Sequence, residues 1–463
     1  MEIIFQSSLL KETKHLDLNV KQTHDGLAIG QSILSLKRFN IVYLLLKYFF
    51  LLPFVICLGA GPSWAQHRDA AIFPIGINID SSISNPADSM PGKKEVDLLD
   101  ILHRIFHPKR DRRSESALKD YSKPHFSVLP AVGYTLSTGL AGIISANVIF
   151  QNNASLHPNL SAILGNISYT EHRQTILQVQ TNIWSRDNKY KWVGDARYLK
   201  YPALTYGLGG ESSPDSGYTV DYSYVRVYQT LLRALGRNLY GGLGYNLDYH
   251  WDINELLNQQ RTTDFQKYGL RSHSVSSGIN FNLLFDNRRN PINANQGLFA
   301  NIVYRLNFTA LGSDNNYQTL IAEIRKYFSV SANKRNVLAL WAYNWVTIGG
   351  EPPYLDLPST GWDGNNNSGR GYIQGRYRGK TFLYLESEYR LGLSANGLIG
   401  AVFFVNAETV NDWPSNKFSL LAPGAGLGLR LLLNKVSGSN IAIDYGFGVN
   451  GSRGLFVNLG EVF

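Results

Sequence analysis

A chain of 463 residues with a single cysteine cannot contain an internal disulfide. Its 27 tyrosines, 43 glycines and two methionines are typical of a β-rich exported protein. Length alone permits two or three soluble domains or one long all-β barrel. The formal net charge of +9 owes much to a basic run at residues 109–113, and basic and aromatic residues are not interleaved as on a nucleic-acid-binding surface. We therefore expect no nucleic-acid partner, and lipid phosphates or lipopolysaccharide as anionic neighbours.

The first 65 residues predict an N-terminal extension followed by a secretory signal peptide. An apolar run at residues 41–58 comes after two basic residues and leads into a small-x-small sequence that ends at Ala65. Cleavage there would remove Cys57 and with it thiolate metal binding and cysteine catalysis. A retained membrane helix, interrupted by Lys47 and Pro53, and lipidation at Cys57 are the alternative interpretations.

Residues 66–125 are polar and turn-rich, and they predict a periplasmic tether with one short helix. Between residues 94 and 106, Val96, Leu99, Leu102 and Phe106 recur at three- and four-residue spacing and form one apolar stripe. Such a helix is compatible with the surface of the inner leaflet, with the interior of a barrel or with a plain tether.

Residues 126–463 change to short alternating segments separated by Gly, Asn, Asp and Ser clusters, which predicts an all-β transmembrane antiparallel barrel. At residues 297–308 apolar and polar side chains fall on opposite faces. Roughly 340 residues shared among sixteen strands leave about ten residues per strand plus turns, the length of a tilted membrane strand. The sixteen candidates begin near Phe126, Leu140, Leu160, Thr175, Tyr190, Tyr218, Asn238, Ser272, Leu298, Tyr317, Asn336, Thr381, Leu398, Ser419, Asn440 and Leu455.

The connections between these strands predict which end of the barrel faces the periplasm. The first strand is taken to start on the periplasmic side, so that tight turns fall on that side and long loops on the other. Short periplasmic turns and long external loops are the pattern of outer-membrane barrels. The turns include residues 186–189, 333–335 and 394–397, and the loops are 201–217, 251–271 and 350–380.

The last predicted strand ends in an aromatic residue. Leu455, Val457, Leu459 and Phe463 are expected to share one apolar face, with Glu461 at the membrane edge, where a charge costs less. Leu459 and Phe463 are similar to the C-terminal signal by which bacterial assembly machinery recognises outer-membrane barrels.

The connection between predicted strands eleven and twelve contains Gly369-Arg370-Gly371-Tyr372, and the next strand reads Leu385-Glu386-Ser387-Glu388-Tyr389-Arg390. With these motifs the chain resembles the bacterial surface antigen superfamily, the BamA- and TamA-like barrels of outer-membrane assembly and the barrels of two-partner secretion. The resemblance implies a sixth external loop that folds back into the lumen, with Arg370, Gly371 and Tyr372 at its tip and Glu388 as the partner of Arg370. Asn406 stands where the family usually supplies an aspartate, so Glu408 and Asp444 are alternative partners.

A second match to the family lies in a predicted periplasmic turn. Asp286, Arg288, Pro291 and Gly297 follow the family pattern, whereas Ala294 stands where a second proline is common. Taken alone, these residues would be an ordinary charged turn.

Three glycines, Gly424, Gly426 and Gly428, alternate along one predicted strand. A phosphate-binding loop needs its glycines in a turn that opens a helix, which excludes that reading. The glycines predict a smooth inner wall against which a folded-in loop packs.

The resemblance implies a barrel that assists protein or lipid insertion or translocation at the bacterial outer membrane. Its partners would be membrane lipids, the barrel-assembly machinery and an unidentified client. Residues 66–125 are too short and strand-poor for the periplasmic polypeptide-transport modules of assembly proteins. Pro130 removes a hydrogen-bond donor from the first strand and predicts weak pairing where the first and last strands meet. A passive pore or a structural surface barrel is the alternative function.

Catalysis is not expected from this sequence. It contains no Gly-x-Ser-x-Gly nucleophile elbow, and its histidines lack the spacing of metal ligands. We therefore assign no catalytic residue, no metal and no cofactor.

Overall fold

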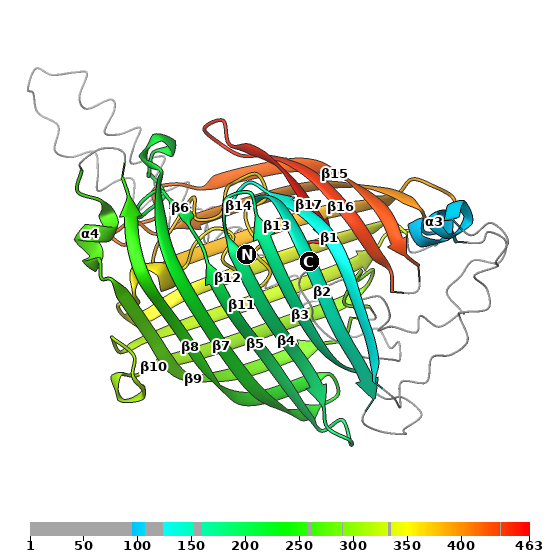
Figure 1. Ribbon diagram of the computed structural model, residues 1–463, viewed down its shortest axis with the longest axis horizontal. Coiled ribbons are helices and arrows are strands. Elements are labelled where there is room, and N and C mark those ends of the chain that lie inside the picture. The colour runs from blue at the N-terminus through cyan, green and yellow to red at the C-terminus, as the bar shows by residue number, and fades with distance from the viewer. Residues whose placement is uncertain are drawn as a thin grey trace, which may run out of the picture. The chain divides into compact units, whose positions relative to one another are not determined.

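The computed structural model describes residues 95–106, 124–151, 160–257, 261–288, 290–331, 335–435 and 437–463, and these residues form a closed antiparallel β-barrel (Figure 1). Strands that follow each other along the chain pair with each other, and β1 meets β17. The strands are β1 (His125–Thr135), β2 (Gly139–Gln151), β3 (Leu160–Thr170), β4 (Thr175–Trp184), β5 (Tyr190–Lys200), β6 (Ala203–Thr205), β7 (Tyr218–Gly236), β8 (Leu239–Leu256), β9 (His273–Asp286), β10 (Gly297–Asn307), β11 (Tyr317–Ser329), β12 (Val337–Gly350), β13 (Thr381–Gly392), β14 (Ile399–Val410), β15 (Ala422–Asn434), β16 (Ser439–Phe447) and β17 (Arg453–Leu459). The helices are α3 (Leu98–Phe106) and α4 (Asp264–Gly269), and the 3₁₀ turns are η3 (Pro214–Ser216), η4 (Thr309–Leu311) and η5 (Tyr354–Asp356).

The barrel has sixteen strands, as predicted, because β5 and β6 are two parts of one strand. Both pair with β7, and they are separated at Tyr201 and Pro202, where proline cannot donate a ladder hydrogen bond. The predicted starts lie within three residues of the observed ones. The largest difference is at β15, which begins at Ala422 rather than Ser419; in the loop before it, the carbonyl of Leu420 accepts a hydrogen bond from Thr409 Oγ1 of β14 (2.5 Å).

Alternation along each strand produces two different barrel faces. In β15 the exposed side chains of Leu427 and Leu429 point outward, whereas the alternating residues Gly428 and Arg430 are buried. The same period of two places Phe403 and Val405 outside on β14. An apolar outer surface and a polar interior are the arrangement of a barrel that spans a lipid bilayer.

The two ends of the barrel differ as predicted. We call turn rim the end that carries the β4–β5, β7–β8, β13–β14 and β15–β16 turns, and loop rim the end that carries the β5–β7, β8–β9 and β12–β13 connections. Arg335 is the one residue of the predicted turn 333–335 that belongs to the described part of the chain. The predicted loop 251–271 is shorter than expected, because β8 continues to Leu256 and α4 follows it.

Helix α3 begins four residues later than predicted, so that Val96 precedes it. Asp97 caps the helix, since its Oδ1 accepts the backbone N–H of Asp100 (2.6 Å). The N–H of Val96 donates to the carbonyl of Asn396 in the β13–β14 turn (3.1 Å), which fixes α3 at the turn rim. Among the helices that the structure describes, none has the length and apolarity to cross a membrane. The predicted signal peptide and most of the predicted tether lie outside the described residues.

The seam between β1 and β17 is weakly paired. β1 pairs with β2 along its whole length, from His125 to Thr135, but with β17 at one Cα pair, Tyr134 with Val457. In this antiparallel register Val132 lies opposite Leu459, where β17 ends. Figure 1 shows the two strands side by side. The start of β1 therefore extends beyond β17 at the turn rim.

The segment after β17 corrects two expectations. Phe463 does not share a face with Leu455, because Gly460 adopts a left-handed conformation (φ 95°) and turns the following residues into the barrel. There the ring of Phe463 stacks on Trp341, with centroids 5.2 Å apart. Glu461 is not at the membrane edge but is buried inside, where it pairs with Arg430. The prediction for both residues was wrong because it extended the two-residue alternation of β17 beyond the end of the strand.

Candidate functional site: a buried ion cluster in the lumen

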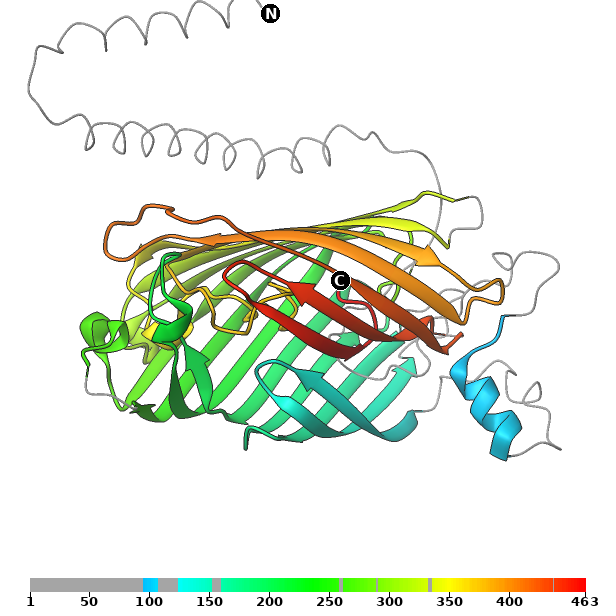
Figure 2. The same ribbon diagram turned by 90° about the horizontal axis from the view of Figure 1, so that it is seen from above.

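The connection between β12 and β13, residues 351–380, folds into the barrel (Figure 2). We call it the lumen loop. Its tip is formed by Arg370, Gly371 and Tyr372, which are buried. The polar inner faces of the strands supply the partners that a buried arginine requires.

Arg370 is the centre of a cluster of three arginines and four carboxylates, which we call the lumen cluster. Its guanidinium donates to Glu388 Oε2 (2.5 Å) and Asp444 Oδ2 (2.9 Å), and also to Glu386. The guanidinium carbon also lies 3.8 Å from the centroid of the Phe404 ring, a cation–π contact. The side chain of Arg370 is 2% exposed and those of its carboxylate partners 0%, so water does not screen these contacts.

Two further arginines extend the lumen cluster to the segment after β17. Arg390 Nε donates to Glu388 Oε1 (2.6 Å), and its Nη2 donates to the carbonyl oxygen of Phe463 (2.7 Å). Arg430 donates to Asp444 Oδ1 (2.6 Å) and to Glu461 Oε2 (2.7 Å). The loop tip and residues 461–463 are therefore held by one network.

The loop tip also uses its backbone to contact the wall. Asn406 Nδ2 donates to the carbonyl of Arg370 (2.9 Å), and Ser452 Oγ donates to the carbonyl of Gly371 (2.7 Å). Tyr372 donates through its hydroxyl to the carbonyl of Pro423 (2.5 Å). Gly371 has φ 105°, and a Cβ there would lie 2.8 Å from the carbonyl oxygen of Phe447, so the position requires glycine.

The predicted glycine wall lies under the loop tip. A Cβ on Gly424 would lie 3.0 Å from the carbonyl oxygen of Arg370 and 2.5 Å from Asn406 Oδ1. A Cβ on Gly428 would collide with the carboxylate of Asp444. The absence of side chains at these positions leaves the space that the loop tip and the cluster occupy.

Gly424→Ala is expected to lower the stability of the folded barrel by about 1–3 kcal/mol, because the added methyl group is too close to the backbone of Arg370. The measurement is the temperature at which the folded band is lost on semi-native gel electrophoresis. Gly142→Ala in β2 is the control, since a Cβ there meets nothing within 4 Å. Equal melting temperatures of the two variants would show that the lumen loop does not depend on the glycine wall for its packing.

The stem of the lumen loop has a second attachment on the other wall. Asp356 Oδ2 accepts a hydrogen bond from Ser276 Oγ of β9 (2.5 Å), and the Tyr354 hydroxyl lies 2.7 Å from Thr205 Oγ1. Burial raises the pKa of Asp356 to about 7, and the charge of Asp248 reinforces the shift. The lumen loop is thus fixed at its tip and at its stem.

The predicted turn motif lies at the turn rim and holds the β9–β10 connection. Arg288 forms a bidentate pair with Asp286 (2.9 and 2.8 Å), and Gly297 has φ 111° with Arg288 directly against it. Between them, Pro291 lies in a segment that reaches across to the β15–β16 turn. The Asn290 and Asn293 side-chain amides donate to the carbonyls of Ser437 (3.0 Å) and Gly438 (3.1 Å).

This crossing segment also contacts the lumen cluster. Arg390 Nη1 donates to the carbonyl of Ala294 (3.3 Å), and Ala294 belongs to the same buried apolar group as Val462 and Phe463. Asn367 of the lumen loop donates to the carbonyl of Val462 (2.8 Å). The interior therefore contains three layers: the lumen loop, residues 461–463 and the crossing turn segment.

The structure brings Arg370 together with the predicted Glu388 and Asn406, and of the two alternative partners it places Asp444, not Glu408, on the guanidinium. Glu386 and Arg390 belong to the strand motif quoted from the sequence, which gave them no role. Arg430 was not predicted, although a charge that continues the alternation of Gly424, Gly426 and Gly428 was a usable signal.

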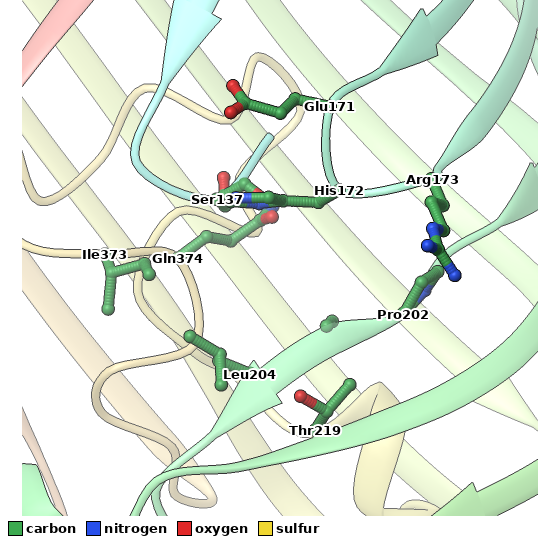
Figure 3. A pocket seen from close by; sticks show the side chains of 10 residues that line it. Ser137, Glu171, His172, Arg173, Pro202, Leu204, Thr219, Ile373 and Gln374 are labelled. Carbon is green, nitrogen blue, oxygen red and sulfur yellow. The ribbon is translucent and has the colours of Figure 1, made fainter. Parts of the chain in front are cut away.

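A cavity of about 370 Å³ lies at the loop rim, and its lining contains no residue of the lumen cluster. Figure 3 shows the side chains that line it. Its polar side chains include Glu171, His172 and Arg173 of the β3–β4 turn, and Ile373 and Gln374 of the lumen loop line it as well. None of the three buried arginines reaches it. Within the part of the chain that the structure describes, no group of three or more His, Cys, Asp or Glu residues could hold a metal ion.

Comparison with known proteins identifies the type of barrel. The family model of the Omp85 superfamily domain matches residues 159–454. BamA from Haemophilus ducreyi lacking POTRA domains 1–3 is similar in structure, with a TM-score of 0.51, 18% sequence identity and coverage of 73% of this chain and 70% of BamA. CdiB from Escherichia coli gives a TM-score of 0.50 at 12% identity, with coverage of 74% of this chain and 63% of CdiB. At these identities the structural similarity shows the fold alone. No curated protein matches the sequence.

Proposed function

This chain belongs to the Omp85 superfamily, as its sequence motifs predicted, and from that premise we propose that the barrel assists the insertion or translocation of protein or lipid at the outer membrane. β-Barrels of this family are outer-membrane proteins. Export by the predicted signal peptide and contact with the barrel-assembly machinery during biogenesis are part of the proposal. It assigns no catalytic step and no cofactor to the chain.

The observation that carries the proposal is the weak seam. A strand pair gains stability from its ladder of hydrogen bonds and cross-strand contacts, and the β1–β17 pair has one Cα pair, Tyr134 with Val457. Pro130, which was expected to weaken this pairing, lies in the part of β1 that extends beyond the end of β17. The seam is therefore the place where the barrel opens sideways at least cost, and a client strand or a lipid would pass there.

The filled lumen favours this function over a passive pore. Free diffusion requires an unobstructed polar channel, whereas here the interior holds the lumen loop, residues 461–463 and the crossing turn segment. A client that passes through the wall at the β1–β17 seam does not require these three layers to move out of the lumen.

A disulfide across the seam tests the proposal. With Cys57→Ser as background, Tyr134→Cys and Val457→Cys replace directly opposed residues, whose Cα atoms in an antiparallel pair lie about 4.5–5.5 Å apart, within disulfide range. We expect vesicles that contain the reduced protein to accelerate either insertion of an unfolded barrel substrate or transfer of a labelled phospholipid between leaflets. Oxidation should return that rate to the rate of empty vesicles, and reduction should restore it.

The matched control is a disulfide in the intact β1–β2 ladder, between Val132→Cys and Gly142→Cys, which form a Cα pair. It should leave both rates unchanged. If the oxidised seam variant is as active as the reduced one, sideways opening is not the mechanism. If the wild-type protein accelerates neither process, the proposed function is wrong.

A further inference from the structure

Helix α3 contacts the barrel through its polar side. The Asp97 carboxylate accepts the backbone N–H of Lys435 in the β15–β16 turn (2.9 Å), and the Asp100 carboxylate accepts the ammonium group of Lys435. Successive side chains of an α-helix are about 100° apart, so Leu102 and Ile105 lie on the side opposite Asp100. The attachment to Lys435 therefore turns the apolar side of the helix away from that turn.

The apolar side of α3 is consequently uncovered. Ile105 is 64% exposed and Leu102 is 39% exposed. An amphipathic helix attached to a globular protein normally buries this stripe against its core. Both side chains therefore keep apolar surface that the described part of the chain does not cover, and this surface is available to an outside partner.

The position of α3 indicates what that partner is. Val96, just before the helix, is bonded to Asn396 in the β13–β14 turn, and this turn is flanked by Leu393 and Ile399, which are 54% and 44% exposed. The apolar outer surface of the barrel thus continues to the turn from which α3 starts. Figures 1 and 2 place α3 at this end of the barrel, next to the ends of β15 and β16. The edge of the bilayer therefore lies at the level of the helix.

We propose that α3 is an interfacial membrane helix, with Leu102 and Ile105 inserted among the phospholipids of the leaflet at the turn rim. Its length of nine residues suits a helix that lies in the interface rather than one that spans the bilayer. This inference goes beyond the proposed function, because it concerns a lipid contact of the helix and not the seam.

A fluorescent probe at position 105 tests the proposal in the full-length protein in nanodiscs. With Cys57→Ser as background, Ile105→Cys is labelled with an environment-sensitive dye, and Arg104→Cys, an exposed neighbour on the polar side, is the matched control. We expect nitroxide-labelled phosphatidylcholine to quench the probe at 105 several-fold more than the probe at 104. Iodide in the water should quench 104 more strongly.

The other outcomes overturn the proposal. Equal quenching by iodide at both positions would show that the apolar side faces water. Protection of position 105 from both iodide and lipid nitroxide would show that a protein, such as a second copy, covers it. Loss of the folded band on semi-native gels identifies any labelled variant that fails to fold.

Discussion

Arg370→Ala is expected to lower the stability of the folded barrel by about 3–5 kcal/mol, the usual cost of removing one partner from a buried ion pair. The alanine leaves Glu386, Glu388 and Asp444 without a shared cation in an environment that water does not reach. Arg390 and Arg430 neutralise this charge in part, since they still pair with Glu388 and Asp444. The loss of the heat-modifiable folded band on semi-native gels measures the change.

The control for this variant lies four residues away in the same loop. Asn366 is exposed, and its left-handed backbone (φ 56°) makes Asn366→Gly a substitution without strain. A melting temperature close to wild type is expected for it. Equal losses in Arg370→Ala and Asn366→Gly would contradict the idea that Arg370 anchors the lumen loop.

Conductance in planar bilayers adds a second readout for Arg370→Ala. The wild-type protein should give small, flickering currents because three layers fill its interior, and the variant should give larger ones because the loop tip is released. Large, steady currents that the substitution does not change would favour the passive pore instead.

Phe463→Ala is expected to cost about 3–5 kcal/mol, as for other buried phenylalanines. The ring stacks on Trp341 and also lies against Tyr327, and it is 4% exposed. Its loss leaves a cavity between the lumen cluster and the crossing turn segment. Melting of the purified, folded protein on semi-native gels measures this effect separately from assembly in the cell.

Leu455→Ala is the matched control, because Leu455 lies on the outer face of β17 and is 37% exposed. We expect it to melt near the wild-type temperature. If Phe463 serves assembly alone, Phe463→Ala will reduce the amount of barrel in the membrane, but the barrel that does fold will melt as the wild type does. That result would reject the structural role assigned to the ring.

The barrel could be predicted from sequence because its physical signal is repeated along the chain. Each strand alternates between lipid and lumen, so an error at one strand does not displace the next one. The pairing of Arg370 with Glu388 followed from family resemblance, and Asp444 was one of two alternatives because sequence spacing does not fix which inner-facing carboxylate the loop tip meets.

The errors lie where the chain leaves a regular element. Phe463 and Glu461 were placed by extending the period of β17 through Gly460, but a single residue of left-handed conformation changes the direction of the chain. The alternation of Gly424, Gly426 and Gly428 could have placed Arg430 on the inner face, but its contact with Glu461 exists only because the last segment has turned inward. Three-dimensional contacts of this kind carry no local sequence pattern.

The two attachments of the lumen loop have a mechanical consequence. One lies on β9 through Ser276 and Asp356, and the other on β13 and β16 through Arg370, so the loop ties together walls that are not neighbours in the sheet. A barrel with one weakly paired strand boundary deforms easily under the lateral pressure of a bilayer. A loop that links two distant walls confines this deformation to the weak boundary. On the proposed mechanism the loop would act as a strut that keeps the cross-section of the barrel from flattening when the seam opens.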